Sequence, residues 1–324
     1  MRHDWLDADG RFLGGAFPLP LDVPFTRGIA RAAGLSAYDV GWLCSRGLVR
    51  PVLHGVHVAA QTPDDLALRA AAVALVLPDT AVVADRTAAW LHGVEILPRS
   101  ALVVAPPLDV VHVDDTRVRR GQVDGRRRGL TEDDVTRIRG LAVTTPLRTA
   151  LDLGRLLWRP DALGALDGFV RAGVPLGDLR DELPRFRGYR GVCQLRLLVP
   201  LADGAAESVA ESGLRLRWHE AGLPAPVLQH WVLDEEGVPV CRLDLADPAV
   251  RYAAEYDGTA FHTSPQDAEH DVRRRTWLAA RGWTVGVFTY EDLYERGADA
   301  RVRLVREYAA ARRACAAWAP GRSA

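Results

Sequence analysis

The chain has 324 residues, with 41 basic and 42 acidic side chains and a formal net charge of -1 at pH 7. This balance excludes a chain that is basic throughout, so any binding of nucleic acid has to come from local patches. All 41 basic positions are arginines, which excludes a catalytic lysine. With 48% hydrophobic residues, a chain of this length is expected to form two or three domains with packed cores.

The cysteines and the apolar runs indicate a protein of the cytoplasm. Four cysteines stand far apart without a CxxC pair, which argues against a zinc site or a disulfide framework. The first 20 residues lack the apolar core of a signal peptide. The longest apolar run, residues 70–77, is too short to span a bilayer. We therefore expect a soluble, cytoplasmic protein without membrane association.

Residues 21–62, after a lead-in over 1–20, have the pattern of a winged helix-turn-helix domain. A short helix is predicted over 25–34, and Ser36 with Asp39 predicts the capping box of a second helix. That helix is expected to end at a glycine, and two short β runs follow. Helix, turn, helix and hairpin is the order of a winged helix, which predicts DNA binding.

Arginines in this region are candidates for contacts with DNA phosphates. Arg46 and Arg50 are predicted to bind DNA, with Arg27 and Arg31 nearby. The alternative is a small helical module with ordinary solvated arginines.

Residues 63–199 are predicted to form a mixed α/β middle domain. The pattern is helical over 63–92, β-like over 100–120 and helical again from Thr131. Thr145 is predicted to cap a helix whose first residue is a proline. Arginines between 117 and 128 fit a solvated hairpin edge or, alternatively, a phosphate contact. Structural ion pairs are expected among four residues of the helices, namely Arg148, Asp152, Asp167 and Arg171.

A third domain is predicted over 204–312, followed by a tail over 313–324. The pattern breaks at 200–204, and a helix over 207–222 precedes three β runs. A helix, a strand and a closing helix complete the order αβββαβα, which predicts a mixed sheet flanked by helices. The whole chain is therefore expected to be an α/β (α+β) multidomain protein.

Acidic residues gather at the ends of two of these β runs. Asp244 lies near the end of one run, and Glu255 and Asp257 lie at the end of the next. Side chains alternate along a strand, so Glu255 and Asp257 point the same way, and Asp244 meets them if the two runs pair. Mutual repulsion of such carboxylates is relieved by a divalent cation, and oxygen ligands suit Mg²⁺ or Mn²⁺.

Glu211 is a further candidate for this metal site. It lies on the apolar face of the helix over 207–222, which is unusual for a carboxylate. The alternative is equally good, because Ser208 and Glu211 have the spacing of a capping box.

Two parts of the chain resemble known families. Residues 204–308 resemble the DUF559 group, relatives of the very-short-patch-repair endonucleases in the PD-(D/E)XK nuclease superfamily. Residues 21–195 resemble AbiEi-type antitoxins of abortive-infection systems. The first resemblance is carried by RLDLA, AAEYDGTAFH, DVRRR and the L-x-x-x-G-W of Leu278 to Trp283, and the second by LHGVHV, DRTAAWLHG and VTTPLRTALDL.

The nuclease resemblance implies roles for the acidic residues. Asp244 and Glu255 are expected to bind Mg²⁺ (or Mn²⁺) directly, and Glu211 through water. The lysine of the superfamily motif is Asp257 in this chain, which is either a third ligand or the cap of a glycine turn.

The same resemblance implies a proton-transfer residue and a phosphate clamp. His262 is expected to act as general base or leaving-group acid, although a lone histidine is more often a packing or surface residue. Arg274 and Arg275 are expected to clamp the scissile phosphate or, alternatively, to form an exposed helix face paired with Asp271.

Three functional hypotheses follow. The first is a DNA-binding protein with a Mg²⁺-dependent endonuclease domain that hydrolyses phosphodiester bonds in phage defence. The second is an AbiEi-like antitoxin and transcriptional repressor whose nuclease fold is catalytically inactive. The third is an interaction protein whose middle region binds a cognate toxin. DNA and a toxin are the partners that these hypotheses name.

Overall fold

The computed structural model forms two compact units, Met1–Asp152 and Leu153–Ala324. Both are mixed α/β, which confirms the predicted fold class. The limits predicted near residues 62 and 204 divide the chain differently and stay predictions. The residues that the structure describes are 3–7, 9–78, 80–96, 104–112, 123–258, 265–295 and 299–317.

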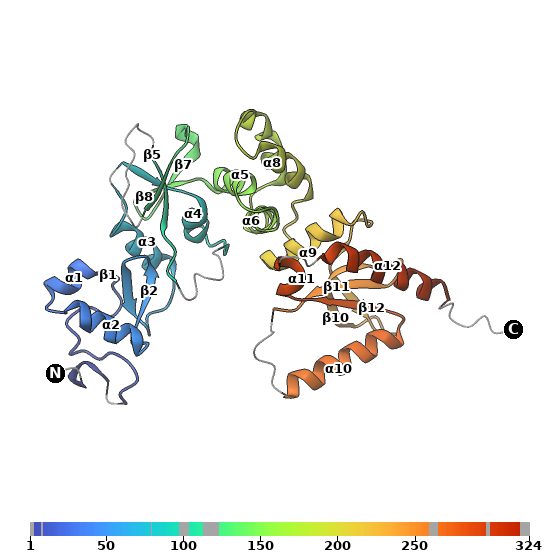
Figure 1. Ribbon diagram of the computed structural model, residues 1–324, viewed down its shortest axis with the longest axis horizontal. Coiled ribbons are helices and arrows are strands. Elements are labelled where there is room, and N and C mark those ends of the chain that lie inside the picture. Colours follow the sequence, from blue (N-terminus) through green and yellow to red (C-terminus); the bar gives the residue numbers. More distant parts are fainter. Residues whose placement is uncertain are drawn as a thin grey trace. The chain divides into compact units, whose positions relative to one another are not determined.

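The N-terminal elements have the order predicted for a winged helix (Figure 1). Ser36 Oγ accepts from the Asp39 N–H at 3.1 Å and Asp39 Oδ2 accepts from the Ser36 N–H at 2.9 Å, so the predicted capping box is confirmed. The strands form a sheet in the order β1-β3-β2. The elements are β1 (Phe25–Thr26), α1 (Arg27–Ala32), α2 (Ala37–Ser45), β2 (Val49–Leu53) and β3 (Val56–Ala59), after a 3₁₀ turn η1 (His3–Trp5).

A five-stranded sheet follows, in the order β6-β5-β4-β8-β7. Strands β4 and β8 are parallel, as are β5 and β6, and the other pairs are antiparallel. The elements are α3 (Leu66–Ala74), β4 (Ala81–Val83), α4 (Asp85–Leu91), β5 (Leu108–His112), β6 (Val123–Arg127), η3 (Glu132–Asp134), β7 (Val135–Ile138) and β8 (Leu141–Thr144).

Two predictions for this region are wrong in detail. Thr131 begins only a 3₁₀ turn, and a β-hairpin replaces the expected helix. The hairpin turns at Arg139 and Gly140, whose φ angles of +46° and +87° suit a tight two-residue turn. The helical pattern over 63–92 is interrupted by β4, whose three buried residues pair with strands on both sides.

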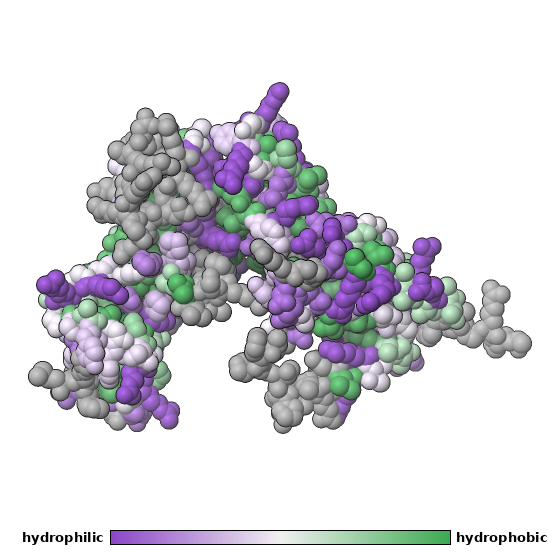
Figure 2. All heavy atoms as spheres, viewed as in Figure 1, coloured by the Kyte–Doolittle hydropathy of each residue, from purple (hydrophilic) through white to green (hydrophobic). Residues whose placement is uncertain are grey.

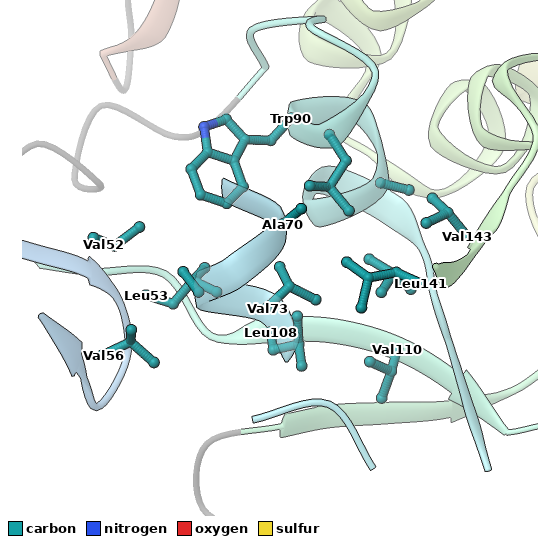
Figure 3. Close-up of a cluster of buried hydrophobic side chains, with 14 of the residues drawn as sticks. Val52, Leu53, Val56, Ala70, Val73, Trp90, Leu108, Val110, Leu141 and Val143 are labelled. Carbon is teal, nitrogen blue, oxygen red and sulfur yellow. The ribbon is translucent and has the colours of Figure 1, made fainter. Parts of the chain in front are cut away.

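One hydrophobic core joins the winged helix to this sheet (Figure 3). Strands β2 and β3 contribute Val52, Leu53 and Val56, which lie in the same cluster as Trp90 of α4 and Leu108 of β5. Burial of this apolar surface couples the stability of the winged helix to that of the sheet.

Five buried charged residues form an ion network in the same unit. Arg148 Nε and Nη1 donate to Asp152 and Asp134, each at 2.8 Å. Arg128 Nη1 donates to the same Asp152 oxygen at 3.1 Å and to Asp85 at 2.6 Å. Each of these five residues is at most 9% exposed. The predicted pairing of Arg148 with Asp152 is confirmed.

The electrostatics of Arg128 show what holds the network together. Burial by itself would lower the pKa of Arg128, but hydrogen bonds and charge from Asp85 and Asp152 raise it. The ionised pairs are therefore strongly coupled, and removing one member leaves a buried charge without its counter-ion.

The helices that follow are packed closely around a second buried pair. A Cβ atom on Gly164 would lie 2.9 Å from Val209 Cα, so the close approach of α6 and α9 requires glycine there. Arg215 Nη2 donates to Asp167 at 2.6 Å. The elements are α5 (Pro146–Leu156), α6 (Arg159–Arg171), α7 (Leu176–Asp181), η4 (Leu183–Phe186), α8 (Val192–Leu198), η5 (Val199–Leu201) and α9 (Val209–Glu220).

Asp167, one of the four residues expected to form ion pairs, therefore pairs with a residue outside that set, Arg215. Arg171 donates to the Ala206 carbonyl instead. Asp167 and Arg171 have helical i, i+4 spacing, but the carboxylate of Asp167 is fully buried and faces α9. Burial raises the pKa of Asp167, and the charge of Arg215 opposes this rise.

The last elements confirm the predicted αβββαβα order, with one extra short helix, α11. Their four strands form a sheet in the order β12-β11-β10-β9, in which only β11 and β12 are parallel. Trp218 of α9 and Leu304 of α12 pack in one cluster, whereas Leu278 of α10 packs in another. The elements are β9 (Val227–Leu233), β10 (Pro239–Asp247), β11 (Tyr252–Tyr256), α10 (Pro265–Ala280), β12 (Thr284–Phe288), α11 (Tyr290–Tyr294) and α12 (Ala300–Ala317).

The surface gives no sign of a membrane segment in the part of the chain that the structure describes. No helix there is both long enough and apolar enough to cross a bilayer. Figure 2 shows hydrophilic and hydrophobic residues interspersed on the visible face.

Replacing Asp152 by alanine should strongly destabilise the N-terminal unit. Two buried guanidinium groups then lose their shared carboxylate, and we expect the free energy of unfolding to fall by about 3–5 kcal/mol. Urea denaturation followed by circular dichroism measures this loss. The matched control is Asp64→Ala, which removes the half-exposed partner of Arg69 and should cost about 1 kcal/mol or less. Equal losses in the two variants would contradict the role of the network.

Candidate functional site

Strands β10 and β11 bring the predicted acidic residues together. They pair antiparallel with Leu245 opposite Ala254, so the next step of the register sets Asp244 against Glu255. Asp244 Oδ2 accepts a hydrogen bond from the Tyr256 N–H at 3.0 Å. The predicted pairing of these two runs is confirmed. A pocket of about 200 Å³ is lined by Asp244, Glu255, Tyr256, Asp257, Arg274, Arg275 and Val287.

The backbone is irregular beside Asp244. Gln229 of β9, between the register pairs Leu243–His230 and Leu245–Leu228, has a φ of +50°. Leu243 and Leu245 of β10 lie in different hydrophobic clusters, although residues two apart normally share a face. Left-handed backbone at a bulky residue is strained and often marks a specialised site. Nothing in the β run 226–233 predicted a left-handed backbone conformation at Gln229.

Glu211 lies at the start of α9 and is bound by the protein itself. Its N–H donates to Ser208 Oγ at 3.1 Å, so Ser208 is the N-cap as predicted. The carboxylate accepts from the Glu207 N–H at 3.0 Å and from Gln229 Nε2 at 2.9 Å. Glu211 does not line the 200 Å³ pocket.

Arg274 occupies the position next to Glu255 that the metal hypothesis assigns to a cation. Its Nη1 donates to Glu255 Oε2 at 3.0 Å, and its Nη2 donates to the other carboxylate oxygen and to the Arg242 carbonyl at 2.9 Å. Arg274, which was predicted to clamp a phosphate, is thus paired with Glu255, which was predicted to bind the metal ion. Arg275 lines the same pocket and is exposed.

The predicted magnesium ligands do not form a ready-made metal site in this arrangement. Among the described residues, no group of three or more histidine, cysteine, aspartate or glutamate side chains is placed to hold a metal ion. The guanidinium of Arg274 supplies the positive charge beside Glu255 that a divalent ion was expected to supply. His262 and the side chain of Asp271 lie outside the described residues.

Asp244 has the most perturbed carboxyl group of this pocket. Burial raises its pKa to about 6, and the charges of Glu211 and Glu255 add to the rise. The hydrogen bond from the Tyr256 N–H and the charge of Arg274 act in the opposite direction. Asp244 is therefore held in an environment that disfavours its ionised form.

The predicted DNA-binding arginines differ in what they contact. Arg50 Nη2 donates to the Thr62 carbonyl at 2.9 Å, so the fold engages this side chain. The guanidinium of Arg46 lies over the Trp42 ring, 5.6 Å from its centroid, at the exposed end of α2. Arg31 is exposed on α1, and Tyr38 on α2 is 69% exposed. Tyr38 was not among the residues predicted to contact DNA, although its place near the start of the second helix would have indicated it as a candidate.

Comparison with known proteins supports one of the two resemblances. Residues 80–201 match the family described as the AbiEi antitoxin C-terminal domain. "Uncharacterized protein MT2308" of Mycobacterium tuberculosis (strain CDC 1551 / Oshkosh) is 34% identical over 273 residues, which is 83% of this chain and 95% of that protein. "Uncharacterized protein Rv2248" of strain ATCC 25618 / H37Rv matches with the same identity and coverage.

This chain belongs to the family of these mycobacterial proteins. Within it, residues 80–201 form an AbiEi-type region, which confirms that part of the sequence prediction. The AbiEi-type region contains the whole ion network, from Asp85 to Asp152, and continues to the end of η5. The DUF559 resemblance of the last domain stays a prediction.

Replacing Asp244 by asparagine should stabilise the C-terminal unit of this protein at neutral pH. The folded pKa of about 6 lies above the usual carboxyl value, so wild type loses stability as pH rises from about 4 to about 6. Asparagine keeps an acceptor for the Tyr256 N–H without the charge. We expect the variant to be more stable by up to about 3 kcal/mol above pH 6, with the difference vanishing near pH 4.

Urea titrations at a series of pH values, with a chelator present, measure this difference. The control variant is Glu236→Gln, which alters an exposed carboxyl group in the turn between β9 and β10. Parallel stability curves for wild type and Asp244→Asn across the whole pH range would show that Asp244 is not held in a disfavoured ionised state.

Proposed function

We propose that this protein is an AbiEi-like antitoxin that represses transcription by binding DNA through its N-terminal winged helix. The single observation that carries the proposal is the match of residues 80–201 to the AbiEi antitoxin C-terminal domain. A winged helix directly precedes this region and shares its core, which supports a DNA-binding module built into the same unit.

The local charge of the winged helix supports DNA binding. Residues 25–59 contain four arginines and one acidic residue, Asp39, whose carboxylate is engaged in the helix cap. This excess of positive charge contrasts with the net charge of -1 of the whole chain. Arg31, Tyr38 and Arg46 present the exposed side chains for contacts with phosphates, and the hairpin of β2 and β3 would be the wing.

A cognate toxin is the second partner that we propose. The reason is the same family match, because the matched domain is described as part of an antitoxin. The C-terminal sheet domain would then act as a scaffold in which Arg274 neutralises Glu255.

Phosphodiester hydrolysis is a second candidate function. It is favoured by one observation: Asp244 and Glu255, from neighbouring strands, line one pocket with Asp257 and two arginines. A divalent ion at this site would have to replace the contacts of Arg274 with Glu255, so the pair opposes a metal-dependent reaction.

DNA binding is tested with a fluorescent duplex of the protein's own promoter. Wild type should bind with a steep dependence on salt, and Arg31→Ala and Arg46→Ala should each weaken binding and lower the slope by about one. The control is Arg313→Ala, which removes an exposed arginine of α12. Absence of binding at low salt, or an equal effect of Arg313→Ala, would refute the repressor proposal.

A cleavage assay separates the two candidate functions. Wild type, Asp244→Ala and Glu255→Ala are incubated with supercoiled DNA and with RNA in Mg²⁺ or Mn²⁺, and nicked and linear products are measured on gels. Because Glu255 is paired with Arg274, we expect no cleavage by any of the three proteins. Cleavage by wild type that both substitutions abolish would establish the hydrolase and overturn the view of this domain as a scaffold.

A further inference from the structure

A pocket of about 400 Å³ lies inside the winged helix, where the start of α1 meets the hairpin of β2 and β3. Its polar side chains are Thr26, Arg27, His54 and His57, and none of the described residues that line it is acidic. The two histidines come from the hairpin and the arginine from α1, so bases from two segments converge on one cavity.

The bases of this pocket repel one another. Burial lowers the pKa of His57, and the charges of Arg27 and His54 lower it further. Among the described residues, none of these three side chains forms an ion pair with a carboxylate. A convergence of bases without a counter-ion is unfavourable by itself and becomes favourable when an anion enters.

His57 also has an unused hydrogen-bonding atom. Its Nδ1 is buried and has no hydrogen-bond partner among the described residues. An unsatisfied buried polar atom is costly for the fold.

The backbone of His57 is flanked by two strands, and its ring is stacked on one side. His57 pairs with Phe25 of β1 and with Pro51 of β2, and its ring is stacked on Phe25 with a centroid distance of 6.0 Å. A side chain fixed by two strands is suited to a defined ligand geometry.

We propose that this pocket binds a phosphate-type anion, with Arg27, His54 and His57 supplying charge and hydrogen-bond donors. A cation would be repelled by Arg27, and a neutral ligand would leave the repulsion among the bases unrelieved. The anion is either a backbone phosphate of bound DNA or a free phosphate group, as in inorganic phosphate or a mononucleotide.

The site is tested on the full chain by NMR titration of the histidine ring signals. Inorganic phosphate, AMP and the promoter duplex are added in separate experiments. At least one should shift the His57 signal to saturation and raise the pKa of His57, because a bound anion stabilises the protonated ring. The signal of His230, which lies in β9 of the other unit, is the internal control and should not move.

Two variants with matched controls complete the experiment. Arg27→Gln should weaken binding of the active ligand about tenfold, as expected for loss of a charge-assisted hydrogen bond. His57→Gln should also weaken binding of the active ligand, followed through the ring signal of His54, with circular dichroism confirming that the variant is folded. Arg313→Gln, which changes charge equally at a remote exposed site, should bind like wild type.

The titrations with phosphate, AMP and the promoter duplex distinguish the two sources of the anion. If Arg27→Gln also weakens promoter binding and lowers its salt slope by about one, the ligand is a DNA phosphate. If phosphate or AMP binds while promoter binding is unchanged, the ligand is a free phosphate group. The phosphate and AMP arms need no DNA binding, so they test the pocket even if the repressor proposal fails. A His57 signal that responds to none of the three ligands overturns the inference.

Discussion

The N-terminal unit depends on a buried carboxylate, Asp152, that two arginines share. Arg148 approaches it from the same helix and Arg128 from the segment after β6. Each guanidinium group also donates to a second carboxylate. Asp134 and Asp85 thereby tie the 3₁₀ turn η3 and the start of α4 to α5. In a low-dielectric interior these charges are tolerated only as a complete set, so the network specifies one arrangement of the AbiEi-type region.

The C-terminal sheet uses arginine in a similar way. Arg274 of α10 binds both oxygens of Glu255 and the carbonyl of Arg242, which connects α10 with two adjacent strands. The neighbouring Asp244 remains in an unfavourable environment, since burial and two nearby carboxylates outweigh the charge of Arg274. Carboxylates that resemble nuclease ligands are thus balanced here by the protein's own cation, which favours a scaffold over a metal centre.

The winged helix adds a different electrostatic arrangement. Its core is continuous with that of the middle sheet, so movements of the winged helix relative to this sheet would disturb buried apolar contacts. Its surface carries arginines without a matching number of acids, and its pocket collects Arg27, His54 and His57. DNA recognition and anion recognition are consistent with one positively charged module attached to an antitoxin-type region.

Local pattern in the sequence determined the helix caps, the winged-helix order and the αβββαβα order, because capping and periodicity depend on residues a few positions apart. The pairing of β10 with β11, and with it the approach of Asp244 to Glu255, could also be predicted from two adjacent apolar runs. Only the tertiary structure decided that Asp167 pairs with Arg215 across 48 positions and that Arg274 engages Glu255. Such pairs depend on which helix faces are buried together, and the spacing of residues within one helix does not determine this.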